Sequence, residues 1–404
     1  MNAKKRTVRR GAYLMAVSSL AVCGFCGCAK NENNIPDSAQ ILSGSDASQS
    51  KSLFEAASEQ SDTQDVAQFT QTSQPIDVPA ASAMPLGLSD NGMIALNLRS
   101  GNGEKIIGVY NSRTNKLTSI KVMDTQYEDG EFYLAGMNTQ MMVFGESLPT
   151  EEGILNRVYL YSFENQQTSQ IAQYGSFSPD TAIASFNDDE IYLNYRVEDS
   201  YKTFRLQPPY DMEKTEVLID VNSSSIIALG DRLYYIELDN SSQATTLWEM
   251  DSTGQQKREV LASQYEDGWL YSLFGRGDKI LLVKVAPDNS RTDLVLLDPK
   301  TGESEVIHTF ERFLNDPQVG ADVMTWWGYG DTSDRPHTMY SVFDLDEGKL
   351  IPYTDSELFV SEYGIVWTRF LSDPWQIPPG EIFESGNSKI MLYKFPSAES
   401  AENG

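Results

Sequence analysis

The side chains that most often carry chemistry are few in this sequence, and their spacing fits no common reaction. The two histidines, His308 and His337, do not form a His-Glu-x-x-His or other metal-ligand pattern. No Gly-x-Ser-x-Gly nucleophile motif occurs, and Gly101-Asn102-Gly103 lacks the lysine and helix of a phosphate loop. The sequence therefore predicts no catalytic residue, no metal site and no cofactor.

Aromatic side chains gather in the C-terminal half, where all six tryptophans occur between Trp248 and Trp375. One interpretation is an aromatic platform that binds a sugar or peptide through ring faces and nearby polar groups. The other is core packing, which adjacent tryptophans in a sheet covered on both faces would also satisfy. The candidate ligand-binding residues are Trp326, Trp327, Tyr329, Asp331, His337 and Trp375.

Paired carboxylates are the remaining chemical possibility, because many enzymes that cleave glycans use two of them. With 58 acidic residues in 404, the sequence alone does not choose a pair. The formal net charge of −27 disfavours nucleic acid as a partner, since its phosphates need lysine and arginine. Such a charge is typical of a soluble surface outside the cell, and it would also attract basic partners.

The N-terminus has the pattern of an export signal. Five basic residues precede residue 11, and an apolar run covers residues 11–25. The run ends in Phe25-Cys26-Gly27-Cys28-Ala29-Lys30-Asn31, which resembles the lipobox of bacterial lipoproteins. Cys28 fits the acylated cysteine, because the small Gly27 precedes it. The resemblance implies a signal peptide over residues 1–27 and anchoring by acyl chains on Cys28; an ordinary secretory signal is the alternative.

Residues 28–65 are rich in Ser, Gln, Asn, Asp and Ala, with Phe54 as the only aromatic. Such a segment buries too little apolar surface to offset chain entropy, so we expect a disordered tether. Cys28 is the first residue of this segment and the other two cysteines lie before it, which excludes disulfides and thiolate zinc sites from the rest of the chain. The expected location is the outer face of the bacterial cytoplasmic membrane or another envelope membrane.

Residues 66–404 carry a repeat that defines the fold class. Gln126-Tyr127-Glu128-Asp129-Gly130 recurs 138 residues later, three times a period of 46, as Gln264-Tyr265-Glu266-Asp267-Gly268. Gly230-Asp231-Arg232-Leu233-Tyr234 recurs in similar form after 47 residues. Repeats of about 40–50 residues made of short strands indicate β-propeller blades. The sequence predicts an all-β protein with a seven-bladed β-propeller, six or eight blades remaining possible, after the disordered tether.

The strand pattern assigns seven units between about residues 85 and 395 and leaves two uncertainties. The first strand of the sixth unit is expected around residues 310–314, where the pattern is weak. The seventh unit lacks a fourth strand, which residues 72–78 could supply to close the ring. Four turns that begin with Asp or Asn, at Asn111, Asp251, Asp298 and Asp344, offer too few oxygen ligands for calcium and are predicted to be hairpin turns.

Strand motifs such as Arg232-Leu-Tyr-Tyr-Ile and Leu247-Trp-Glu-Met-Asp resemble those of the Tol-associated periplasmic propeller family and its lipoprotein relatives. The resemblance implies a non-catalytic binding or assembly role. The leading hypothesis is thus a membrane-anchored extracytoplasmic lipoprotein that binds an envelope protein or peptide. Two alternatives remain open: a glycan-binding or glycan-cleaving propeller using the aromatic residues above, and a sensor for a basic peptide.

Overall fold

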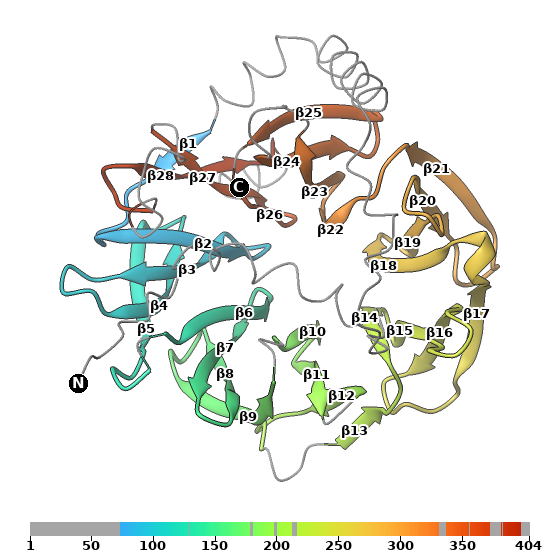
Figure 1. Cartoon of the computed structure of the whole chain (residues 1–404), viewed down its shortest axis with the longest axis horizontal. Coiled ribbons are helices and arrows are strands. Elements are labelled where there is room, and N and C mark those ends of the chain that lie inside the picture. Colours follow the sequence, from blue (N-terminus) through green and yellow to red (C-terminus); the bar gives the residue numbers. More distant parts are fainter. Residues whose placement is uncertain are drawn as a thin grey trace, which may run out of the picture.

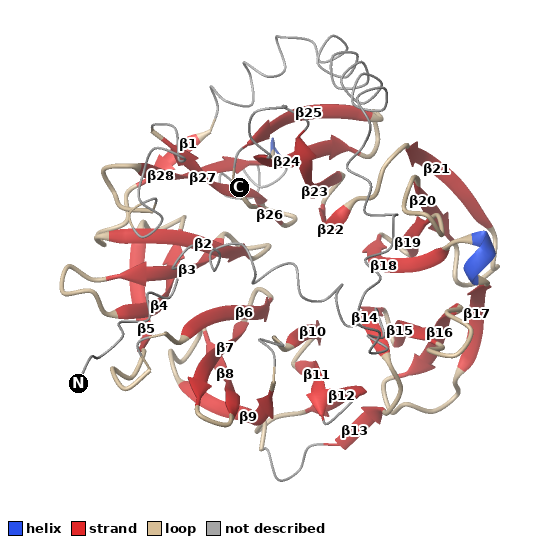
Figure 2. Cartoon of the chain, in the orientation of Figure 1, coloured by secondary structure: helices blue, strands red, loops and turns tan. Residues whose placement is uncertain are grey.

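The computed structural model describes residues 73–127, 129–177, 181–197, 200–211, 216–330, 337–354, 356–371, 381 and 383–396. The predicted signal peptide, Cys28 and the tether lie outside these residues. Within them, strands form seven four-stranded antiparallel sheets arranged as a ring (Figure 1). Figure 2 shows almost no other regular structure apart from a short 3₁₀ helix, Tyr265–Asp267. The prediction of a seven-bladed propeller is confirmed.

Blades 1 to 4 follow the chain, with the inner strand first in each. Blade 1 contains β2 (Ser82–Leu88), β3 (Met93–Arg99), β4 (Lys105–Asn111) and β5 (Lys116–Val122). Blade 2 contains β6 (Glu131–Met137), β7 (Met141–Thr150), β8 (Gly153–Ser162) and β9 (Thr168–Ser176). Blade 3 contains β10 (Ile183–Asn187), β11 (Glu190–Val197), β12 (Ser200–Leu206) and β13 (Glu216–Ile219). Blade 4 contains β14 (Ser223–Leu229), β15 (Arg232–Leu238), β16 (Thr245–Asp251) and β17 (Arg258–Ser263).

Blades 5 to 7 complete the ring. Blade 5 contains β18 (Trp269–Arg276), β19 (Lys279–Val285), β20 (Thr292–Leu297) and β21 (Ser304–Phe310). Blade 6 contains β22 (Asn315–Gly320), β23 (Val323–Gly330), β24 (His337–Asp344) and β25 (Lys349–Thr354). Blade 7 contains β26 (Leu358–Val360), β27 (Gly364–Phe370), β28 (Ser388–Lys394) and, as its outer strand, β1 (Gln74–Ile76).

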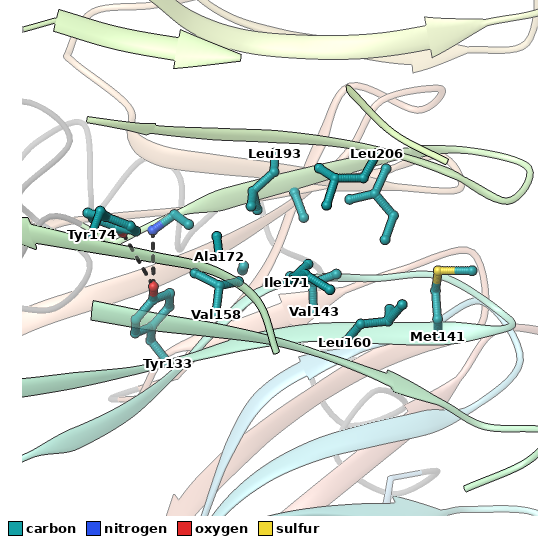
Figure 3. Close-up of a cluster of buried hydrophobic side chains, with 14 residues drawn as sticks. Tyr133, Met141, Val143, Val158, Leu160, Ile171, Ala172, Tyr174, Leu193 and Leu206 are labelled. Atoms are coloured by element: carbon teal, nitrogen blue, oxygen red, sulfur yellow. Dashed lines mark hydrogen bonds between the residues drawn. The ribbon is translucent and has the colours of Figure 1, made fainter. Parts of the chain in front are cut away.

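The two ends of the chain share blade 7, as the sequence predicted. Gln74 pairs with Leu392 and Ile76 with Ile390 in antiparallel register. Beside this ladder, Ile76 and Val78 pack against the cluster that joins blades 7 and 1. Each of the other blade junctions has its own cluster of buried side chains, and Figure 3 shows the one between blades 2 and 3. There the Tyr133 and Tyr174 hydroxyls lie 3.4 Å apart.

Two inner strands differ from the sequence expectation. The first strand of blade 6 is Asn315–Gly320, whereas residues 310–314, where it was expected, contain the end of β21 and the connection that follows it. In blade 1 the inner strand Ser82–Leu88 lies ahead of the first strand that the pattern identified. Both strands contain a proline, Pro317 and Pro85, which weakens the strand pattern but is tolerated at a sheet edge.

The Asp- and Asn-initiated turns are hairpin turns, as predicted. In the turn after β16, Asp251 Oδ1 accepts hydrogen bonds from the backbone N–H groups of Thr253 and Gln255, 3.0 and 2.9 Å away. Gly254 closes this turn with φ +78°, and Asn115 takes the equivalent left-handed conformation with φ +54°. Among the described residues, no helix is long and apolar enough to cross a membrane.

Candidate functional site

The predicted aromatic candidates divide between the core and one end of blade 6. Trp326 is 3% exposed and packs between Phe310 and Phe343, with ring centroids 5.1 and 6.2 Å away. Its indole is therefore part of the core between blades 5 and 6. Trp327, the next residue, points to the other face of the sheet and is half-buried.

The remaining candidates are placed only in part. Tyr329 lies in β23, and His337 is the first residue of β24, so the same hairpin holds both with Trp327. Asp331 and Trp375 lie outside the described residues. The other histidine, His308, has a structural environment, with Nε2 3.2 Å from the Leu345 carbonyl oxygen and the ring edge-on to Phe343.

Trp327 belongs to a row of residues that crosses blade 6. It pairs with Asn315 on the inner strand and with Tyr340 on the third strand, and Tyr340 pairs in turn with Thr354. The Asn315 side-chain amide donates a hydrogen bond to the Trp327 carbonyl oxygen at 3.2 Å. This row lies near the end of the blade where the inner strand begins.

Two carboxyl groups that sequence reasoning did not single out lie beside this row. Asp316 is the second residue of the inner strand β22, and Glu357 directly precedes the inner strand β26. Figure 1 places these strands next to the centre of the ring. Tyr271 occupies the corresponding position near the start of β18, so the inner-strand regions of three consecutive blades each contribute one group, and Tyr340 of β24 adds a second group from blade 6. We call Tyr271, Asp316, Tyr340 and Glu357 the inner-strand site.

Local backbone irregularity sets the direction of the Asp316 side chain. The pairing between β22 and β23 shifts register between Asn315 and Gln318, and Asp316 has φ +46°. A similar shift occurs in β18 between Leu270 and Ser272, around Tyr271. Bulges of this kind re-aim a side chain, and aspartate is among the residues that accept a left-handed conformation. The Asp316 backbone N–H lies 3.4 Å from the Tyr271 hydroxyl oxygen, to which it donates.

The charge of Asp316 acts on each of the other three groups. Burial raises the pKa of Asp316 to about 6. Burial, and secondly the negative charge of Asp316, raises the pKa of Glu357 to about 8. The pKa of Tyr271 rises to about 12 through burial and then through Asp316. Burial, followed by the charges of Glu357 and Asp316, also raises the pKa of Tyr340.

Neither carboxyl group has a hydrogen-bonding or ion-pairing partner in the part of the chain that the structure describes. Both residues remain partly accessible to water, yet protein atoms surround them closely enough for burial to dominate their pKa values. Aromatic rings border Tyr271, with the centroids of Trp269 and Phe313 each 5.1 Å from its own. Other charged residues contrast with this pair: buried Glu146, for instance, accepts a hydrogen bond from the Tyr159 hydroxyl at 2.9 Å.

The inner-strand site can do two kinds of chemistry. Two carboxyl groups with different pKa values can serve as an acid and a base. Alternatively, they can bind a positively charged group that supplies the missing partner. No group of three or more His, Cys, Asp or Glu side chains suited to hold a metal ion occurs among the described residues.

The fold defines the class of the protein, the seven-bladed β-propellers. No protein-family model matches the sequence, and no curated protein matches it. Among solved structures, an oligogalacturonate lyase in complex with manganese is 11% identical with a TM-score of 0.50, over 81% of this chain and 93% of that one. The oligogalacturonate lyase of Vibrio parahaemolyticus is 8% identical with a TM-score of 0.51, over 81% and 94%.

TolB from Acinetobacter baumannii is also among the structural neighbours. It is 10% identical with a TM-score of 0.42, and the match covers 65% of this chain and 63% of TolB. These likenesses concern the propeller fold.

Proposed function

We propose that the protein is a membrane-anchored extracytoplasmic lipoprotein whose propeller binds an envelope protein or peptide without catalysing a reaction. The observation that carries the binding role is the pair Asp316 and Glu357, which the described chain leaves without partners. Burying a carboxylate that has no partner destabilises a protein, so such groups are typical of binding and active sites. The lipobox around Cys28 supports the anchor.

A partner that contacts the inner-strand site would dock on the end of the propeller where the inner strands begin. The first and third strands of a blade run parallel, so the turn between the second and third strands lies where the inner strand begins. In blade 5 this turn contains Ser290, which is exposed and close in register to Trp269 and Tyr271. The turn that contains Asp278 lies at the opposite end of the same blade.

Site-specific cross-linking in cells tests the proposal. A photoreactive amino acid at position 290 should capture one envelope protein in high yield, whereas the same amino acid at position 278 should capture little. In parallel, Cys28→Ser should abolish labelling with a fatty-acid analogue and release the protein from the membrane fraction. Equal capture from both positions, or none, would reject docking at this end, and a labelled Cys28→Ser variant would reject the anchor.

A glycan ligand is the second candidate, and one observation favours it. The different pKa values of Asp316 and Glu357, close to the half-buried Trp327, match what an acid–base pair beside an aromatic platform requires. A panel of envelope glycans incubated with the protein decides this point. Cleavage that is lost in Asp316→Asn and Glu357→Gln would replace the non-catalytic role with an enzymatic one.

A further inference from the structure

The inner-strand site has the composition of a receptor for one positively charged group. Its acceptors come from three blades: Asp316 from β22, Glu357 from the start of β26, and the Tyr271 hydroxyl from β18. Tyr340 adds a second hydroxyl from β24. A ligand that binds among these groups would therefore contact oxygen atoms supplied by separate strands, and not only the two oxygens of a single carboxylate.

The charge of the site fits a single cation. Near neutral pH Asp316 is mostly ionised and Glu357 mostly protonated, so the pair carries about one negative charge. Both carboxyls lie deep enough for burial to dominate their pKa values, and the described chain supplies neither with an ion pair. Other acidic residues of this protein form ion pairs with lysine or arginine, as Glu190 does with Arg205. A cation from a ligand would give Asp316 the same kind of partner.

The geometry distinguishes among cations. Calcium takes six to eight oxygen ligands, and the described site offers two carboxyls and two phenolic hydroxyls. A guanidinium group is planar and matches one carboxylate through two parallel hydrogen bonds. An ammonium group has three donors that spread in different directions, which suits acceptors on separate strands. The nearby rings of Tyr271, Trp269 and Phe313 would add cation–π attraction.

We propose that the inner-strand site binds the ammonium group of a lysine side chain presented by the protein or peptide that docks on this end of the propeller. The inference rests on the proposed binding function, and it names the chemistry by which the partner is recognised. Asp316 forms the ion pair with one N–H group, and Glu357 and the Tyr340 hydroxyl accept the other two.

Calorimetric titration of the full chain in detergent, at low salt and pH 7.5, tests the inference. The probe is a capped pentapeptide with one central lysine among glycines, and its control is the same peptide acetylated on the lysine Nζ. Acetylation should weaken binding by about tenfold or more, because it removes the charge and two donors. Asp316→Asn and Glu357→Gln should each weaken binding of the lysine peptide by at least about fivefold.

Two matched variants keep the test interpretable. Asp278→Asn removes one exposed carboxylate from the opposite end of blade 5 and should change binding less than about twofold. Tyr340→Phe keeps the ring and removes the hydroxyl, so it should weaken binding without unfolding the blade. If the carboxyl variants do not fold, the comparison of the two peptides on the unaltered protein still decides the question.

The outcomes separate this inference from the proposed function. Equal binding of the acetylated peptide, tighter binding of an arginine peptide, or competition by a neutral glycan instead of the lysine peptide would overturn the lysine assignment. If cross-linking from position 290 still captured an envelope protein, the proposed function would stand without it. Conversely, specific lysine binding with no captured protein would leave the ammonium site in place and reject the protein-partner proposal.

Discussion

At the scale of single residues, Glu357 links the site to the stability of the fold. Its pKa rises from an ordinary value of 4.5 to about 8, so the folded state holds the proton more tightly than the unfolded state. The free energy of unfolding should therefore fall as pH rises from about 4.5 to 8, and the loss should be complete above 8. Asp316 and Tyr340 are the titratable groups that interact with Glu357.

Glu357→Gln should remove this pH-dependent loss. We expect the variant to be more stable than the unaltered protein by about 1–3 kcal/mol at pH 8.5, because the buried negative charge is gone, and equally stable near pH 4. Chemical denaturation at the two pH values measures the difference. A variant that is equally stable at pH 8.5, or less so, would show that Glu357 is not held in an unfavourable charged state.

Glu146 is a buried carboxylate that, unlike Glu357, forms ion pairs with basic residues of the chain. It is 2% exposed and lies 3.3 Å from Lys121 Nζ, which belongs to blade 1, and it accepts the Tyr159 hydroxyl hydrogen bond. Glu146→Gln should destabilise the fold by about 2 kcal/mol, because it leaves two partly buried cations without a counter-charge. Thermal unfolding measures this loss of stability, with Asp278→Asn as the control at an exposed carboxylate. Equal melting temperatures for the two variants would contradict a stabilising role of Glu146.

The candidate site was only partly predictable from sequence for a reason that these residues make clear. Trp327, Tyr329 and His337 were predicted as candidates because aromatic clustering is visible along the chain, and their binding role stays a prediction. Asp316 and Glu357 are two of 58 acidic residues, and only ring closure brings their inner strands together. The one feature of the sequence that could have pointed to them is their position in the repeat, because both occur near the start of the first strand in consecutive repeats.

At the scale of elements, the sequence pattern predicted the central strands of the blades correctly and missed two of the edge strands. Central strands such as Lys279–Val285, which contains the apolar run Ile280–Val283, were assigned correctly, because both of their faces pack against neighbouring blades. The missed inner strands contain Pro85 and Pro317. The closing strand contains Pro75 as well, but it was predicted because the seventh unit lacked a fourth strand. A proline cannot donate a backbone hydrogen bond to a neighbouring strand, so it occurs in edge strands. It also interrupts the alternating residue pattern by which a strand is predicted from sequence.

The closing strand β1 should stabilise the whole ring. Removing residues 1–79 deletes its ladder with β28 and the contacts of Ile76 and Val78, whereas removing residues 1–72 leaves both in place. We expect the longer deletion to lower stability by about 2–3 kcal/mol from lost apolar burial and to form oligomers through the exposed edge of β28. Calorimetry and light scattering compare the two; identical melting temperatures and two monomers would show that closure does not depend on β1.

At the scale of the whole molecule, the net charge of −27 should act on the partner before the inner-strand site does. A long-range field of this sign accelerates the approach of a basic partner and is screened within about 8 Å at physiological salt. The association rate of a lysine-rich peptide should therefore fall steeply between 50 and 500 mM salt, while the dissociation rate changes little. Stopped-flow fluorescence separates the two rates.

Comparison with Glu357→Gln distinguishes the field from the site. That variant alters one buried carboxyl that is mostly protonated near neutral pH, so the salt dependence of the association rate should persist. Its dissociation rate should increase, because the hydrogen-bonding carboxyl group is replaced at the point of contact. A salt dependence that disappears with this single substitution would place the attraction in the site alone, and the acidity of the rest of the molecule would then have no part in recognition.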